Sequence, residues 1–293
     1  MLFVTEEQVR AHLPMSKAIE LMRETFVALH NKTALNQPRR RLHLPTGTVL
    51  HSLAGAFGKY LGTKVYATNP RHGAYFYFLL FDAETAKPLA LFDANHLGQI
   101  RTGAASGYAT ALLASPTAST LAIIGSGFQA RTQLDAMREV RHFKDIRVWS
   151  RKEENRSRFA SETGTRATAS AREAVEGADV VVTATWSKDP VVENAWIAPG
   201  THINAMGSNQ AQRREVPTDL VQRADLIAVD SIEVSKIEAG DLLLAPVDWS
   251  DRRIVELADV EMRPPGNPVT IFKSNGLGVE DVAAAAYIYE RLS

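Results

Sequence analysis

The sequence contains no cysteine, which excludes disulfide bonds, thiol nucleophiles and metal sites with cysteine ligands. It also has no excess charge of either sign, because 33 basic residues balance 33 acidic ones. That balance is atypical of proteins that bind nucleic acid or a membrane surface. No apolar run approaches the roughly 18 residues of a membrane-spanning helix, and the N-terminal residues carry no basic segment before an apolar one. We therefore expect a cytoplasmic protein.

Two common kinds of catalytic site also lack their signatures. The eight histidines form no H-x-x-x-H pair and no cluster with acids at ligand spacing, so no metal site is predicted. No G-x-S-x-G motif is present, which removes the commonest signature of serine hydrolases.

The most informative segment begins with an apolar run at 121–124, which leads directly into Gly125-Ser126-Gly127-Phe128-Gln129-Ala130. A helix-like stretch and a second strand-like run at 146–149 follow. Gly125 allows a tight turn, Gly127 lets the backbone approach a pyrophosphate, and Ala130 keeps the helix close to the strand. The order predicts a βαβ unit that binds a dinucleotide; the alternative is a tight turn without a ligand.

The residues after the second strand indicate which dinucleotide is preferred. NAD-binding units usually carry an acid there, whereas this chain has Ser150, Arg151 and Lys152. Asp145 precedes the strand and should lie at its opposite end. The pattern favours NADP(H), with NAD(H) possible, unless Arg151 and Lys152 only begin the solvated stretch 151–158.

The pattern of expected elements changes near residue 115. Before it, Thr5 to Gln8 resembles a capping box that opens a helical region. Strands are then expected at 48–54, 62–67, 74–81 and 88–92, followed by a helix at 103–113. After it, helices alternate with strands expected at 121–124, 146–149, 180–183, 202–205 and 226–229. This alternation is typical of a parallel sheet covered on both faces, and the chain ends in a helix at 279–292.

Three cations lie ahead of the expected nucleotide domain: Arg40, Lys64 and Arg101. If they converge, they suit a small carboxylate, because a guanidinium can bind both carboxylate oxygens. Each alone is more often a surface charge.

Six motifs occur along the chain in the following order: Gln37-Pro38-Arg39-Arg40, Gly62-Thr63-Lys64-Val65, Arg101-Thr102-Gly103-Ala104-Ala105-Ser106, Gly125-Ser126-Gly127, Asn204-Ala205-Met206-Gly207-Ser208-Asn209, and Phe272-Lys273-Ser274-Asn275-Gly276 with Asp281. With these motifs the chain resembles, nearly from end to end, the family of ornithine cyclodeaminase and mu-crystallin. The resemblance implies an α/β fold in which a Rossmann-type parallel-sheet domain, 115–277, accompanies a smaller α+β substrate and dimerisation domain, 1–114 with 278–293. It also implies a homodimer, with the active site between the domains.

The resemblance further implies site residues. Arg40, Lys64 and Arg101 would grip the substrate carboxylate, Asn209 would also contact the substrate, and Lys64 and Arg101 would be catalytic. The expected cofactor contacts are Thr102, Gly125, Ser126, Gly127, Phe128, Gln129, Ser150, Arg151, Lys152, Thr183, Ala184, Thr185, Met206, Gly207, Ser208, Lys273 and Ser274.

The chain departs from the cyclodeaminases of this family at Asn209, where they carry an aspartate thought to handle protons. An amide cannot act as a general base. We therefore expect an NAD(P)H-dependent reductase of a small cyclic 2-imino acid, such as Δ1-pyrroline-2-carboxylate or Δ1-piperideine-2-carboxylate. Alanine dehydrogenase and ornithine cyclodeaminase are the enzymatic alternatives, and a non-catalytic NADPH-binding protein resembling mu-crystallin is the alternative of another class.

Overall fold

The computed structural model describes residues 1–293 and divides the chain into two compact units. One comprises Met1–Ala104 with Gly276–Ser293, and the other comprises Ala105–Asn275. The first unit is therefore built from both ends of the chain, and the second from its middle.

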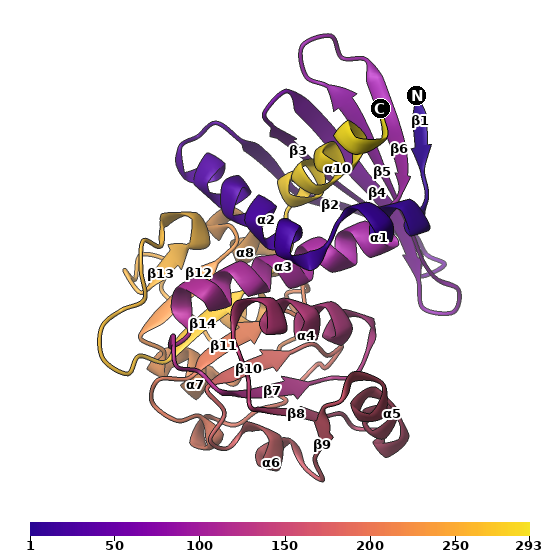
Figure 1. Ribbon diagram of the computed structural model, residues 1–293. Helices are drawn as coiled ribbons and strands as arrows, with labels where there is room; N and C mark the ends of the chain where they lie inside the picture. Colours follow the sequence, from indigo (N-terminus) through magenta and orange to yellow (C-terminus); the bar gives the residue numbers. More distant parts are fainter. The chain divides into compact units, whose positions relative to one another are not determined.

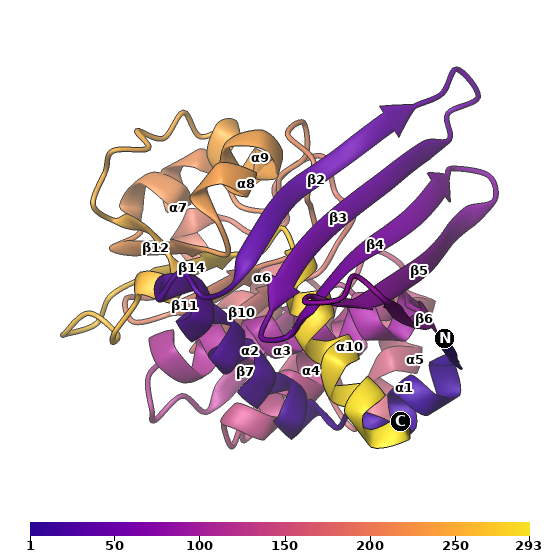
Figure 2. The ribbon, with the colours of Figure 1, turned by 90° about the horizontal axis from the view of Figure 1, so that it is seen from above.

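The first unit contains a six-stranded sheet in the order β1-β6-β5-β4-β3-β2. Its strands are β1 (Leu2–Val4), β2 (Leu35–His43), β3 (Val49–Phe57), β4 (Tyr60–Asn69), β5 (Gly73–Asp82) and β6 (Pro88–Asp93). Neighbours are antiparallel except for β1 and β6. Strands β2 to β5 run side by side as long arrows in Figure 2. The four predicted strands of this region are confirmed as β3 to β6, whereas β2 was not predicted.

Three helices belong to the first unit, namely α1 (Glu6–His12), α2 (Met15–His30) and α10 (Gly278–Leu292). The predicted capping box opens α1, because the Gln8 N–H donates to Thr5 Oγ1 and the Thr5 N–H donates to Gln8 Oε1. Helix α10 crosses strand β3 so closely that a Cβ on Gly55 would lie 2.5 Å from the backbone nitrogen of Val279. A fourth helix, α3 (Asn95–Leu113), begins in this unit and ends in the other. Figure 1 shows α2 and α10 beside the sheet.

The second unit contains an eight-stranded sheet in the order β13-β12-β14-β11-β10-β7-β8-β9, all parallel. Its strands are β7 (Thr120–Ile124), β8 (Asp145–Trp149), β9 (Arg166–Ala167), β10 (Val180–Thr183), β11 (His202–Ala205), β12 (Leu226–Val229), β13 (Ile254–Glu256) and β14 (Thr270–Lys273). Its helices are α4 (Phe128–Val140), α5 (Glu153–Thr163), α6 (Ala171–Val175), α7 (Thr218–Arg223), α8 (Ile232–Glu238) and α9 (Gly240–Leu243), with short 3₁₀ turns η1 (Asn194–Trp196) and η2 (Leu257–Asp259). The predicted Rossmann-type sheet is confirmed.

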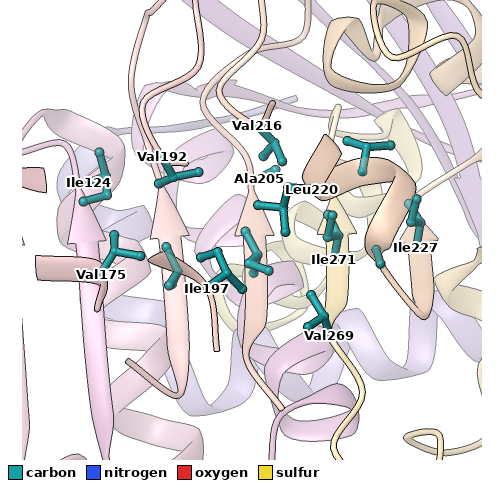
Figure 3. Close-up of a cluster of buried hydrophobic side chains, with 14 of the residues drawn as sticks. Ile124, Val175, Val192, Ile197, Ala205, Val216, Leu220, Ile227, Val269 and Ile271 are labelled. Carbon is teal, nitrogen blue, oxygen red and sulfur yellow. The ribbon is translucent and has the colours of Figure 1, made fainter. Parts of the chain in front are cut away.

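The core of the second unit lies between the central strands and the helices that cover one face. Figure 3 shows side chains of this core, among them Ile124 of β7, Ala205 of β11 and Ile271 of β14. All residues of β10, β11 and β14 are buried, as expected for parallel strands with helices on both faces. No helix in the structure is both long enough and apolar enough to span a bilayer.

Candidate active site

Lys64 and Arg101 come together in the first unit around a carboxylate from the C-terminal helix. Asp281 Oδ1 accepts hydrogen bonds from Lys64 Nζ at 3.1 Å and from Arg101 Nε at 3.3 Å. Arg101 Nη1 also donates to Glu280 Oε2 at 2.7 Å. All four side chains are buried. Lys64 comes from strand β4, Arg101 from helix α3, and the two carboxylates from helix α10. We call these four residues, together with Arg39 described below, the cation cluster.

Two glycines make room for the cation cluster. A Cβ on Gly98 would collide with the ammonium of Lys64, and a Cβ on Gly276 would lie 2.6 Å from Arg101 Nη1. Gly276 also has a φ of +83°, in the left-handed region that favours glycine. Both glycines are therefore needed for the cations to lie where they do.

The structure places Arg40 apart from Lys64 and Arg101 and brings Arg39 to them. Strand β2 carries a bulge in which Gln37 pairs with Ala54 but Arg40 pairs with Ser52, so Pro38 and Arg39 lie opposite the single residue Leu53. Arg40 therefore points with Ser52 to the face opposite Lys64 and is exposed. Arg39 is buried on the inner face, where its Nη2 donates to Gly276 O at 3.4 Å.

The charges in the cluster change the acidity of Lys64. Burial lowers the pKa of Lys64 to about 8, helped by the positive charges of Arg101 and Arg39 and opposed by Asp281. Burial also disfavours the charged form of Arg101, but the carboxylates of Asp281 and Glu280 outweigh it and raise its pKa. Lys64 can thus release a proton near neutral pH, whereas Arg101 remains charged.

The second unit presents the glycine motif at the point where the strand order reverses. Chain order runs from β7 outward through β8 and β9 on one side and through β10 and β11 on the other. Ligands of open parallel sheets bind outside the carboxyl ends of strands at such a point. Gly125, with a φ of +122°, follows β7, and a Cβ on it would collide with the carbonyl oxygen of Ala184, which follows β10. The turn thus requires glycine.

Gly127 has a different role, because a Cβ on it would meet no protein atom within 4 Å. It precedes α4, and no side chain caps that helix. A glycine that packing does not require, at a helix start without a side-chain cap, fits a ligand phosphate brought close to the backbone. Phe128 is partly exposed, and Gln129 follows it in the first turn.

The tip of β8 carries hydroxyl and cationic groups and no acid. Ser126 Oγ donates to Ser150 Oγ at 2.8 Å, which links the glycine turn to this tip. Arg151 and Lys152 are exposed. Asp145 is the first residue of β8, at the opposite end as expected, and it forms an ion pair with Arg147.

The other predicted cofactor residues lie at or just after the ends of β10, β11 and β14, apart from Thr102 in α3. The hydroxyls of Thr183 and Thr185 and the N–H of Gly207 donate to the carboxylate of Glu215. Met206, Ser208 and Ser274 lie in these same strand ends. Asn209 follows them in the loop after β11. These segments meet at one edge of the parallel sheet.

Thr102 and Lys273, two further predicted cofactor residues, also have polar groups engaged within the protein. Thr102 Oγ1 donates to Gly98 O at 2.7 Å inside α3. Lys273 is fully buried, forms an ion pair with Asp241 at 3.0 Å and donates to the carbonyl oxygens of Ala205 and Ser208.

Sequence reasoning did not assign roles to Arg39, Glu280, Asp281 or Glu215. Arg39 was hidden by the bulge, because simple alternation along a strand does not reveal which of two adjacent arginines faces inward. Asp281 belongs to one of the motifs, and its place in the first turn of the C-terminal helix is a sequence feature that could have indicated a carboxylate with a structural role. Glu215 gave no local signal.

A family model described as ornithine cyclodeaminase/mu-crystallin matches residues 1–293. Ketimine reductase mu-crystallin of Mus musculus is 38% identical over 220 residues, covering 73% of this chain and 69% of that protein. The Δ1-pyrroline-2-carboxylate reductase of Thermococcus litoralis, solved with NADH and L-proline, has a TM-score of 0.93 and 31% identity, covering 99% of this chain and 97% of that one. An archaeal alanine dehydrogenase dimer with bound NAD has a TM-score of 0.90 and 29% identity, covering 99% and 95%.

Proposed function

The chain belongs to the ornithine cyclodeaminase/mu-crystallin family, as the sequence resemblance predicted, and we propose that it is a nicotinamide-dependent reductase of small cyclic 2-imino acids. It is an oxidoreductase acting on the C=N bond, and Δ1-pyrroline-2-carboxylate and Δ1-piperideine-2-carboxylate are the proposed substrates. Relatives named for ketimine reductase and Δ1-pyrroline-2-carboxylate reductase activities support this assignment.

The observation that carries the proposal is the buried cation cluster. Three basic side chains, Arg39, Lys64 and Arg101, share it with two carboxylates, Glu280 and Asp281. When all five are ionised, the cluster holds one more positive than negative charge, which a substrate with one carboxylate would neutralise. Guanidinium groups bind carboxylates through paired hydrogen bonds. Arg39 therefore replaces Arg40 in our assignment of the residues that bind the substrate.

The chemistry assigns different tasks to the cations. When bound, the nicotinamide supplies a hydride to the imine carbon. Arg39 and Arg101 hold the substrate carboxylate, and Lys64 in its ammonium form donates a proton to the imine nitrogen. The C=N bond thus becomes CH–NH, and the Lys64 amine regains its proton from solvent. A pKa of about 8 suits this task, because Lys64 is charged but readily deprotonated at neutral pH.

Asn209 argues against cyclodeamination as the main reaction. Release of ammonia from ornithine requires a group that moves protons at the substrate, and an amide cannot do so. Alanine dehydrogenase activity uses the same hydride chemistry, so only the choice of substrate separates it from imine reduction.

We propose NADP(H) as the preferred cofactor. Ser150, Arg151 and Lys152 at the tip of β8 can receive a 2′-phosphate, and Asp145 at the opposite end of the strand cannot reach the ribose. Gly125 and Gly127 would seat the pyrophosphate. The two related structures contain NADH and NAD, so the preference rests on these residues of this chain.

We also propose a homodimer formed through the outer face of the first sheet. This face carries exposed apolar side chains on neighbouring strands, including Leu42 on β2, Leu50 on β3, Val65 on β4 and Tyr77 on β5. Such a contiguous apolar surface is typical of subunit interfaces. Its partner is a second copy of this chain, as in the alanine dehydrogenase dimer.

The experiment that tests the function is a substrate panel followed by NADPH absorbance. We expect rapid oxidation of NADPH with Δ1-pyrroline-2-carboxylate or Δ1-piperideine-2-carboxylate and slow oxidation with pyruvate plus ammonia. The opposite order would establish an alanine dehydrogenase. Ammonia release from ornithine with only catalytic NAD would establish a cyclodeaminase, and tight NADPH binding without turnover of any substrate would establish a binding protein.

A further inference from the structure

Glu215 is a fully buried glutamate whose carboxylate joins the ends of two central strands. Its Oε1 accepts from the N–H and the hydroxyl of Thr185, each at 2.6 Å. Its Oε2 accepts from the hydroxyl of Thr183 at 2.9 Å and from the N–H of Gly207 at 2.6 Å. Thr183 and Thr185 lie at the end of β10 and Gly207 follows β11, so one side chain satisfies four donors from two loops.

The four hydrogen bonds favour the ionised carboxylate, whereas burial and the negative charge of Asp241 raise the pKa of Glu215. Each oxygen accepts two hydrogen bonds, and the Thr185 and Gly207 backbone donors cannot be turned away. A glutamine has the same size, but its NH₂ group would face the backbone N–H of either Thr185 or Gly207 and could not accept from it. Charge-assisted bonds to a carboxylate are also the stronger kind.

The loops that Glu215 joins are in direct steric contact. A Cβ on Gly207 would collide with the backbone of Thr185 and lie 2.5 Å from Glu215 Oε1. The Ala184 carbonyl oxygen in turn leaves no room for a Cβ on Gly125. A shift of the Thr185 segment would therefore also displace the glycine turn after β7.

Glu215 is itself held through its backbone by Asp241 of helix α9. Asp241 Oδ1 accepts from the N–H groups of Glu215 and Val216, at 2.6 and 2.9 Å. Asp241 Oδ2 forms an ion pair with Lys273 of β14, which also donates to the carbonyl oxygens of Ala205 and Ser208. The carboxylate thus has a fixed position relative to both loops.

We propose that Glu215 is a positioning residue that fixes the segments 183–185 and 205–208 for binding of the nicotinamide cofactor. The proposal rests on the proposed function, because it takes these segments as cofactor contacts. Glu215 acts through the loops and does not touch the cofactor.

The test compares Glu215→Gln with Glu256→Gln in the full-length protein. Glu256 is a matched control, since it is a partly buried glutamate of the same sheet whose Oε1 accepts from the N–H of Ile232. Calorimetric titration with NADPH measures the dissociation constant, and hydrogen exchange of the cofactor-free protein reports on the N–H groups of Thr185 and Gly207. We expect Glu215→Gln to raise the dissociation constant at least tenfold and to accelerate exchange at both groups, with neither effect in Glu256→Gln.

Wild-type affinity in Glu215→Gln, or unchanged exchange at Thr185 and Gly207, would overturn the proposal. If Glu215→Gln does not fold, Thr183→Val removes a single donor at nearly constant volume, and we expect a several-fold weaker affinity; no weakening would also overturn it. A wild-type protein that binds neither NADPH nor NADH would instead overturn the proposed function.

Discussion

Lys64 and Asp281 are 217 positions apart in the sequence, yet Lys64 Nζ lies 3.1 Å from Asp281 Oδ1 with both side chains buried. The C-terminal helix thus completes a site whose cations come from the first 101 residues. Removal of one partner from a buried ion pair leaves an uncompensated charge, which typically costs about 3–5 kcal/mol. The pair therefore couples the stability of the first unit to the acidity of Lys64.

The rate of imine reduction is expected to decline at alkaline pH. As the proposed proton donor, Lys64 acts only in its charged form, so kcat/KM should fall about tenfold per pH unit above its pKa of about 8. In Lys64→Arg the side chain at position 64 stays charged, so kcat/KM should no longer decline above pH 8. Most of the activity should also be lost. An unchanged pH profile in Lys64→Arg would rule out Lys64 as the proton donor.

Asp281→Asn is expected to move that decline to lower pH. The negative charge of Asp281 raises the pKa of Lys64, so its removal lowers the pKa and leaves less of the charged form at pH 7.5. The variant should also unfold at a lower temperature. Glu290→Gln on the same helix removes an exposed ion pair with Lys59 and should leave the pH profile unchanged. The interpretation fails if both variants keep the wild-type profile.

Ser150→Asp is expected to reverse the cofactor preference. An acid at the tip of β8 repels the 2′-phosphate and can accept hydrogen bonds from a ribose hydroxyl. The KM for NADPH should rise at least tenfold and the KM for NADH should fall, while the KM for the imine stays the same. Steady-state kinetics with both cofactors provides the measurement, and a wild-type protein that prefers NADH would contradict our assignment of Ser150, Arg151 and Lys152.

Buried His202 is expected to make the fold sensitive to acid. Burial lowers the pKa of His202 from 6.5 to about 3, so the folded protein keeps this histidine neutral while the unfolded chain binds a proton below pH 6.5. Its contribution to stability is complete above pH 6.5 and is lost as the pH falls toward 3. Between pH 6.5 and 5 the loss is about 2 kcal/mol. Urea unfolding of His202→Gln should show a smaller loss over this interval, and the exposed His72→Gln should match the wild type.

Much of the fold follows from local patterns in the sequence. Strands β10, β11 and β12 were predicted at their observed bounds. Strands β10 and β12 are almost continuous apolar runs, as buried parallel strands usually are, whereas β11 alternates polar and apolar residues. Strand β2 was missed because its basic triplet at 39–41 has no apolar alternation. Its position in the sheet depends on pairing with β3, which is a non-local interaction that local periodicity does not report.

The candidate site was predictable only in part. Lys64 and Arg101 lie within motifs and both contact Asp281, whereas the bulge at Pro38 turns Arg40 to the other face of the sheet. The counter-charge Asp281 comes from the other end of the chain, and a sequence does not show which carboxylate neutralises a given cation. Glu215 was missed because only the fold brings it to its partners Thr183, Thr185 and Gly207.

We propose that the cation cluster holds the substrate carboxylate, and the most direct test is substrate discrimination by Arg39→Gln. The measurement is the ratio of kcat/KM for Δ1-pyrroline-2-carboxylate to that for Δ1-pyrroline, which lacks the carboxylate. A site built around a polar group rejects an analogue without it by about 10⁴-fold. We expect a kcat/KM ratio of about 10⁴ in the wild type and in Arg40→Gln. In Arg39→Gln we expect this ratio to be at least 100-fold smaller. An equal ratio in Arg39→Gln and the wild type would contradict the account.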